Sequence, residues 1–241
     1  MAKMKDLIID IGNTRIKVAE FEDAILTSVE VMTAAELIQF LDKNSDYKSK
    51  FYSSSANPDG EIEQLLLGKY GFEALNRQLN MPFHNTYQTP ETLGLDRLAL
   101  AAAAIKLFPD SNVLVIDAGT CITYDLINAK GEYIGGAIAP GISMRYHAMN
   151  HYTAGLPLLK LARVDKLIGS TTEACMNIGV EKGVVFEVDA MIKAYELEFD
   201  KLNIVLTGGD TFHLAGQLKN SIFANPNFIL EGLECIMTYN L

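Results

Sequence analysis

The feature that most constrains this chain is a short apolar segment that ends in Asp-x-Gly and occurs twice. Residues 7–12 read Leu-Ile-Ile-Asp-Ile-Gly, and residues 113–119 read Val-Leu-Val-Ile-Asp-Ala-Gly. Each segment predicts a buried strand, and the alternating residues that follow predict the second strand of a hairpin. The interval from Asp10 to Asp117 is close to half of the 241 residues. The recurrence therefore predicts two copies of one β-rich unit.

The remaining patterns fill both halves with further strands and helices. In the first half we expect strands at 25–32 and 50–54 and helices at 34–41, 61–69 and 95–108. In the second half we expect a helix within 142–151, a long helix from 171 toward 199, a strand at 202–206, a short helix, a strand around 228–230 and a C-terminal helix. Ser170 and Glu173 fit a capping box at the start of the long helix. The linker-like residues 109–112 predict two α/β domains, 1–112 and 113–241.

Charge and cysteine usage limit the classes of function. The formal net charge is −10, with 20 basic and 30 acidic residues and no run of basic residues. Such a chain repels phosphate backbones and anionic lipid, so we expect neither a nucleic-acid nor a membrane partner. Cys121, Cys175 and Cys235 are far apart and odd in number, which is typical of reduced thiols. With no secretory segment and no apolar run long enough to cross a bilayer, we expect a cytoplasmic protein.

The two Asp-x-Gly turns are candidate phosphate-binding sites. In the first, Gly12 lets backbone amides approach an anion, Asn13 and Thr14 offer side-chain hydrogen bonds, and Asp10 suits a hydrated Mg²⁺. Lys17 follows a few residues on. An ordinary hairpin turn would use the same residue types, but the second turn, from Asp117 to Thr120, favours phosphate binding by two equivalent units. Neither turn is a P-loop or a dinucleotide-binding fingerprint.

A third motif, Gly94-Leu-Asp-Arg97, precedes the Ala- and Leu-rich helix. Asp96 is expected in the first helical turn, where free amides stabilise its charged form. An ionised carboxylate suits a base that accepts a hydroxyl proton during phosphoryl transfer. The structural alternative is a helix-start Asp beside an Arg, which is favourable in any protein.

Together these motifs resemble those of type III pantothenate kinases in their order and spacing. The motifs are Asp10–Thr14, Gly94–Arg97, Asp117–Thr120, Gly135–Gly141 and Thr207–Asp210, and they span nearly the whole chain. The resemblance implies two similar ribonuclease-H-like halves around an ATP cleft, the actin-like ATPase fold. It also implies ATP-dependent phosphorylation of pantothenate to 4'-phosphopantothenate, the first step of coenzyme A biosynthesis.

The resemblance assigns roles to individual residues. Asp96 matches the proton acceptor for the pantothenate hydroxyl, and Asp117 matches the ligand of a monovalent cation, potassium or ammonium. The implied ATP-binding residues, with Mg²⁺, are Asp10, Gly12, Asn13, Thr14, Lys17 and Thr120. The implied pantothenate-binding residues are Tyr87, Gly94, Leu95, Asp96, Arg97 and Thr172. The sequence departs from the family at Thr171, where Asn is common, and at Cys121, where a smaller residue is usual.

Assembly and alternative functions are also part of the expectation. The resemblance implies a homodimer, and Gly179 and Gly183 on one face of the long helix would allow close packing. One alternative is a transcriptional accessory protein of the same family, which the acidic chain and the intact Asp96 disfavour. Another is a related small-molecule kinase, against which Tyr87 and the Gly94–Arg97 motif argue. His147 and His151 have metal-like spacing but lack a third ligand.

Overall fold

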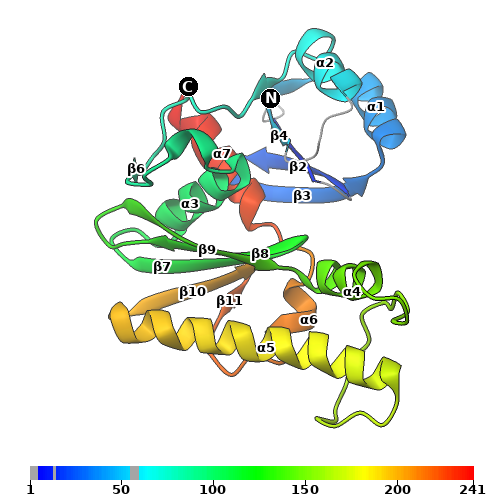
Figure 1. Ribbon diagram of the computed structural model, residues 1–241. Helices are drawn as coiled ribbons and strands as arrows, with labels where there is room; N and C mark the ends of the chain where they lie inside the picture. The colour runs from blue at the N-terminus through cyan, green and yellow to red at the C-terminus, as the bar shows by residue number, and fades with distance from the viewer. Residues whose placement is uncertain (1–4, 13–14, 55–59) are drawn as a thin grey trace. The chain divides into compact units, whose positions relative to one another are not determined.

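The computed structural model describes residues 5–12, 15–54 and 60–241, and it forms two compact units (Figure 1). The first unit contains residues up to Pro109, together with Gly131–Tyr133 and Asn227–Leu241. The second contains Asp110–Lys130 and Ile134–Pro226. The division at 109–110 lies close to the expected boundary. The C-terminal helix, however, groups with the first unit and not with the expected second domain.

The first unit is built on a sheet of five strands in the order β3-β2-β1-β4-β5. The strands are β1 (Lys5–Ile11), β2 (Ile16–Glu22), β3 (Ile25–Met32), β4 (Tyr47–Ser54) and β5 (Glu73–Ala74). Strands β1, β2 and β3 pair antiparallel, whereas β4 lies parallel to β1. This confirms the predicted hairpin of β1 and β2. The predicted ATP-binding residues Asn13 and Thr14 lie outside the described residues.

Successive side chains along the strands point to opposite faces of this sheet, and helices cover both faces. Leu7, Ile9 and Ile11 of β1 belong to a core cluster with apolar residues of α1 (Ala34–Lys43) and α2 (Gly60–Gly68). The opposite face carries α3 (Leu95–Leu107) and α7 (Phe228–Tyr239), which contact β4 and each other. These two helices approach so closely that a Cβ on Gly232 would collide with the backbone of Ala99.

The second unit repeats the same strand order. Its strands are β7 (Asn112–Ala118), β8 (Cys121–Ile127), β9 (Glu132–Pro140), β10 (Leu202–Thr207) and β11 (Phe223–Ala224), arranged β9-β8-β7-β10-β11. Again the central strand pairs antiparallel with the next strand in sequence and parallel with the fourth. The helices are α4 (Ile142–His151), α5 (Thr172–Glu198) and α6 (Thr211–Ala215), and Figure 1 shows α5 lying along β10. The repeated order confirms the prediction of two similar α/β halves.

Shorter elements complete the first unit. The two-residue strand β6 (His84–Asn85) pairs with Glu132 and Tyr133, the first residues of β9, which group with that unit. A 3₁₀ turn, η1 (Pro90–Thr92), leads into α3. Within the described residues, no helix is long and apolar enough to span a bilayer.

Two sequence-based expectations are wrong. The N-cap of α5 is Thr171, not Ser170, because Thr171 is extended and its Oγ1 accepts a hydrogen bond from the backbone N–H of Ala174 at 3.1 Å. The expected strand around 228–230 is the start of α7. There Leu230, Leu233 and Met237 are buried at helical spacing, three and four residues apart.

Candidate active site

Asp10 lies near the carboxyl end of the central strand of the first unit. In the strand register it stands between Lys17 on β2 and Ser53 on β4. Ile9 and Ile11 point toward α1 and α2, so Asp10 and its two neighbours lie on the face that α3 and α7 cover. The fold therefore brings two predicted ATP-binding residues, Asp10 and Lys17, together.

The environment of Asp10 disfavours the ionised form of its carboxyl group. Burial raises the pKa of its carboxyl group from 3.8 to about 6, Lys17 lowers it, and the nearby negative charge of Asp96 raises it further. A buried carboxylate with a second negative charge nearby favours binding of a cation.

Asp96 lies in the first turn of α3, as predicted. Its Oδ1 accepts a hydrogen bond from the backbone N–H of Arg97 at 2.8 Å. The carboxylate folds back so far that a Cβ on Gly94 would collide with Oδ1. Gly94 is therefore needed for the position of Asp96, which explains why the motif begins with glycine.

Arg97 contacts two tyrosine rings, Tyr87 and Tyr133, whose centroids lie 6.1 Å from each other. Its guanidinium carbon is 5.8 Å from the ring centroid of Tyr87 and 5.9 Å from that of Tyr133, a distance typical of cation–π contacts. Arg97 is 5% exposed. The structure thus brings together Tyr87 and Arg97, both predicted to bind substrate. Tyr133 could not be identified from the sequence, because nothing in its local pattern indicates that β9 begins beside Arg97.

In the second unit, Asp117 occupies the position that corresponds to Asp10. It pairs with Thr123 on β8 and with Thr207 on β10. Gly208 has φ +94° and lies against it, since a Cβ there would collide with Asp117 Oδ1 and the Ala118 carbonyl oxygen. The backbone N–H of Asp210 donates to that same carbonyl oxygen at 2.9 Å. The Thr207–Asp210 motif therefore folds directly onto the predicted cation ligand.

The predicted phosphate turn at Gly119–Thr120 lies against the start of α4. The backbone N–H of Gly141, the N-cap of α4, donates to the Thr120 carbonyl oxygen at 3.1 Å. A Cβ on Gly141 would collide with the Gly119 and Thr120 carbonyls. Oxygen atoms thus cluster around this strand end, a donor set that suits a hard monovalent cation, while the amino end of α4 favours an anion nearby.

Thr172 is the first helical residue of α5, directly after the Thr171 cap, and it is exposed. The 152–171 segment before it has no regular secondary structure. It is fastened by Glu181, a fully buried residue whose Oε2 accepts a hydrogen bond from the Val164 backbone N–H at 2.6 Å.

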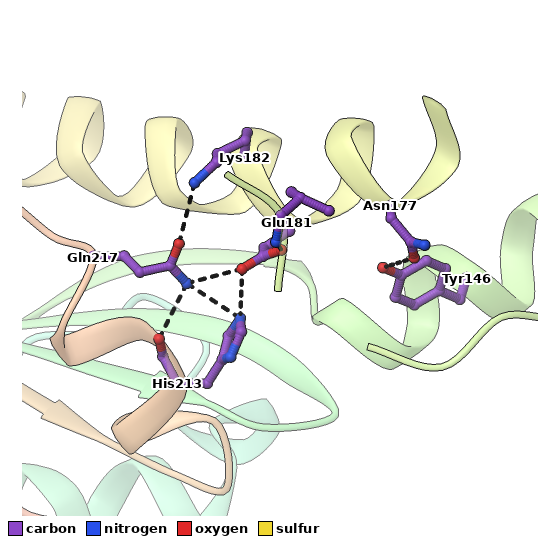
Figure 2. Close-up of polar contacts among 7 residues, drawn as sticks. Tyr146, Asn177, Glu181, Lys182, His213 and Gln217 are labelled. Atoms are coloured by element: carbon purple, nitrogen blue, oxygen red, sulfur yellow. Dashed lines mark hydrogen bonds and ion pairs between the residues drawn. The ribbon is translucent and has the colours of Figure 1, made fainter. Parts of the chain in front are cut away.

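Glu181 also connects α5 to α6, as Figure 2 shows. Its Oε1 accepts from Gln217 Nε2 at 3.1 Å and lies 3.3 Å from His213 Nε2. Nearby, the Tyr146 hydroxyl donates to Asn177 Oδ1 at 2.8 Å and ties α4 to α5. Sequence reasoning did not find this network, because its members come from separate elements.

The same unit contains a cavity of about 430 Å³. Its lining includes Tyr146 and His147 of α4, residues 158–161 and Asp210. His147 Nδ1 lies 2.8 Å from the Ser143 carbonyl oxygen. Among the described residues, no three His, Cys, Asp or Glu side chains gather as a metal site.

The predicted site residues are thus distributed over both units. Asp10, Gly12, Lys17, Tyr87 and Gly94–Arg97 belong to the first unit, and Asp117, Thr120 and Thr172 belong to the second.

Comparison with known proteins supports a kinase. A family model described as type III pantothenate kinase matches residues 6–194. A type III pantothenate kinase from Flavobacterium johnsoniae is 43% identical over 244 residues, covering 98% of both chains. One from Christiangramia forsetii is 42% identical over 239 residues, with the same coverage.

Two solved structures share the fold. A conserved putative Baf family transcriptional activator from Campylobacter jejuni has a TM-score of 0.62 at 24% identity, covering 97% of this chain and 98% of that one. An inorganic polyphosphate/ATP-glucomannokinase from an Arthrobacter species has a TM-score of 0.53 at 15% identity, covering 98% and 99%.

The duplicated sheets and these likenesses define the class of the fold as that of actin-like ATPases and sugar kinases, as predicted from the sequence. The matched model and the full-length relatives are more specific. The chain belongs to the type III pantothenate kinase family.

We predict that Asp10→Asn stabilises the folded protein while removing the candidate cation ligand. The pKa of Asp10 is about 6 in the folded state and 3.8 without burial, so the folded protein favours the neutral carboxyl group. The resulting contribution to the free energy of unfolding is fully present below pH 3.8 and is lost as the pH rises to about 6. At pH 7, without divalent cations, the variant should gain up to about 3 kcal/mol in the free energy of unfolding.

Guanidinium unfolding at pH 4 and pH 7 measures this difference. The gain should shrink toward pH 4, and the exposed control Asp46→Asn should stay within about 0.5 kcal/mol of the wild type at both values. A destabilised Asp10→Asn at pH 7 would show that the carboxylate is paired favourably.

Proposed function

We propose that this protein transfers the γ-phosphoryl group of ATP to the primary hydroxyl of pantothenate, forming 4'-phosphopantothenate and ADP in the cytoplasm. Membership of the type III pantothenate kinase family supports the reaction. The observation that carries the assignment to particular residues is the approach of two carboxylates, Asp10 and Asp96, in the first unit. One suits a metal-bound phosphate and the other suits proton transfer.

Asp96 is the proposed proton acceptor. The hydrogen bond from the Arg97 backbone N–H fixes Oδ1 and leaves Oδ2 to receive the hydroxyl proton. As that proton leaves, the hydroxyl oxygen attacks the γ-phosphorus and the bond to the ADP oxygen breaks. Because a loose phosphoryl transition state requires little covalent help, positioning and electrostatics supply most of the catalysis.

Arg97 is the proposed partner of the pantothenate carboxylate. Its planar guanidinium matches a carboxylate in a bidentate geometry. Tyr87 and Tyr133 restrict its orientation from the ring faces. Thr172 of the second unit is a further proposed substrate contact.

The phosphates of ATP are proposed to bind the turns of both units. Gly12, Asn13, Thr14 and Lys17 would act in the first and Thr120 in the second. When bound, Mg²⁺ would neutralise charge on the phosphate oxygens, and Asp10 would hold it through water. Asp117 and the neighbouring carbonyl oxygens fit a potassium or ammonium ion, which would add positive charge near the phosphates.

We predict that Asp96→Asn lowers kcat by about 10²- to 10⁴-fold, the usual contribution of a positioned base. The amide keeps the shape of the side chain but accepts a proton poorly, so ATP binding should change little. ADP formation with and without pantothenate measures turnover. No pantothenate-dependent turnover in the wild type would refute the function, whereas a variant above half of wild-type kcat would make Asp96 structural.

The monovalent cation gives a separate prediction. Wild-type enzyme should be nearly inactive in sodium and strongly activated by potassium or ammonium, because the phosphates meet few fixed cations. Asp117→Asn should abolish most of that activation while circular dichroism shows an unchanged fold. Equal wild-type activity in sodium and potassium would contradict the cation site without contradicting the kinase.

A homodimer is also proposed, with α5 as part of the interface. Gly179, Gly183, Phe186 and Ala190 follow one another at helical spacing, and Phe186 is 54% exposed. Light scattering should give twice the chain mass of 26.5 kDa. Phe186→Glu should weaken the dimer, whereas Leu67→Glu, an exposed control on α2, should not. A fully active monomer would contradict this proposal.

A further inference from the structure

Ser53 is a buried polar residue of the first unit, next to Asp10 in the sheet register. It is 1% exposed and lies one residue before the end of β4. Its register partner on β1 is Asp10, and the register partner of Asp10 on β2 is Lys17. The three residues form a row across neighbouring strands, on one face of the sheet.

The Ser53 hydroxyl has no hydrogen-bond partner among the described residues. Buried hydroxyl groups are nearly always hydrogen-bonded, since an unpaired one is unfavourable in a low-dielectric interior. Alanine would fill almost the same space without that penalty. An orphaned hydroxyl beside a candidate active-site carboxylate therefore points to a polar ligand that binds there.

The second unit places a hydroxyl residue at the corresponding position. Strand β10 corresponds to β4 in the repeated strand order, and its Thr207 pairs in register with Asp117. Thr207 is 2% exposed, much as Ser53 is. Each half of the molecule thus sets a buried Ser or Thr beside its central-strand aspartate.

The surroundings of Ser53 restrict what can bind it. Because Ser53 is almost completely buried, its hydroxyl could reach only a group as small as water. The two carboxylates of Asp10 and Asp96, against the single positive charge of Lys17, favour a cation over an anion nearby. Magnesium keeps several water molecules when it binds proteins through carboxylates. We propose that the Ser53 hydroxyl hydrogen-bonds a water molecule in the hydration shell of the divalent cation that binds with the nucleotide at Asp10.

This proposal rests on the proposed ATP-dependent function, and it makes Ser53 a positioning residue for the metal–nucleotide complex. The hydroxyl would orient the water, and the water would fix the cation relative to the Asp10 carboxylate. Ser53 would therefore affect cation affinity directly and pantothenate affinity little.

Ser54 provides a matched control. It is the next residue on β4, and its hydroxyl also has no hydrogen-bond partner among the described residues. Its register partner is Ile11, so alternation places it on the opposite face, toward α1 and α2. Removing the Ser54 hydroxyl deletes the same kind of atom from the same strand as in Ser53→Ala, but it leaves the face that carries Asp10 unchanged.

The experiment titrates the protein with Mn²⁺ in the presence of ADP and follows free Mn²⁺ by electron paramagnetic resonance. Ser53→Ala should raise the dissociation constant for Mn²⁺ about tenfold, the effect of losing one hydrogen bond. Ser54→Ala should stay within about twofold of the wild type. Ser53→Cys, of nearly the same volume but poor hydrogen-bonding capacity, should behave like Ser53→Ala and serves if the alanine variant is unstable.

Turnover provides a second readout. In Ser53→Ala the Mg²⁺ concentration needed for half-maximal activity should rise by a similar factor, with little change in KM for pantothenate. Unchanged Mn²⁺ affinity in Ser53→Ala and Ser53→Cys, or an equal loss in Ser54→Ala, would overturn the proposal. So would a wild type that binds no Mn²⁺ with ADP.

These outcomes remain distinguishable from failure of the proposed function. Mn²⁺ binding requires no pantothenate, so absent pantothenate turnover would refute the substrate assignment and leave the binding comparison valid.

Discussion

The burial of the Asp10 carboxyl group, in the same unit as Asp96, is the constraint on which the rest of the candidate site depends. The fold holds both carboxylates in one unit, one at the end of a central strand and one in a first helical turn. Burial makes the ionised Asp10 unfavourable in the absence of ligand. A bound divalent cation would offset that penalty by stabilising the ionised form of Asp10.

The repeated sheet explains how the chain places such groups reliably. In each half the central strand ends in Asp-x-Gly between an antiparallel and a parallel neighbour. Glycines at 94, 141 and 208 then allow neighbouring backbone or carboxylate atoms to approach more closely than any side chain would permit. The surrounding strands and helices hold these contacts, which leaves the chemistry to a few polar side chains at the strand ends.

Much of this arrangement could be predicted from the sequence. Strong alternation and buried runs identified the main strands, and the recurrence of Asp-x-Gly identified the duplication. Prediction failed where contacts between distant parts of the chain decide which secondary structure a segment adopts. The apolar run at 228–230 fits a buried strand as well as a buried helix, and its packing against α3 selects the helix. Thr171 and Ser170 are both good caps, and backbone geometry selects Thr171.

The parts of the site that the sequence did not reveal share one physical cause. Tyr133, Ser53 and Glu181 act through partners that are far away in sequence, and short-range patterns carry no information about such contacts. Glu181 in particular looks like one more polar residue of a long helix. Only the fold shows it buried and connected to the 152–171 segment and to α6.

A crystal structure with Mn²⁺, a non-hydrolysable ATP analogue and pantothenate would test the central claim most directly. We expect anomalous density for Mn²⁺ beside Asp10, and the primary hydroxyl of pantothenate within about 3 Å of an Asp96 oxygen. A metal bound away from Asp10, or a pantothenate hydroxyl that approaches neither the γ-phosphate nor Asp96, would contradict the account.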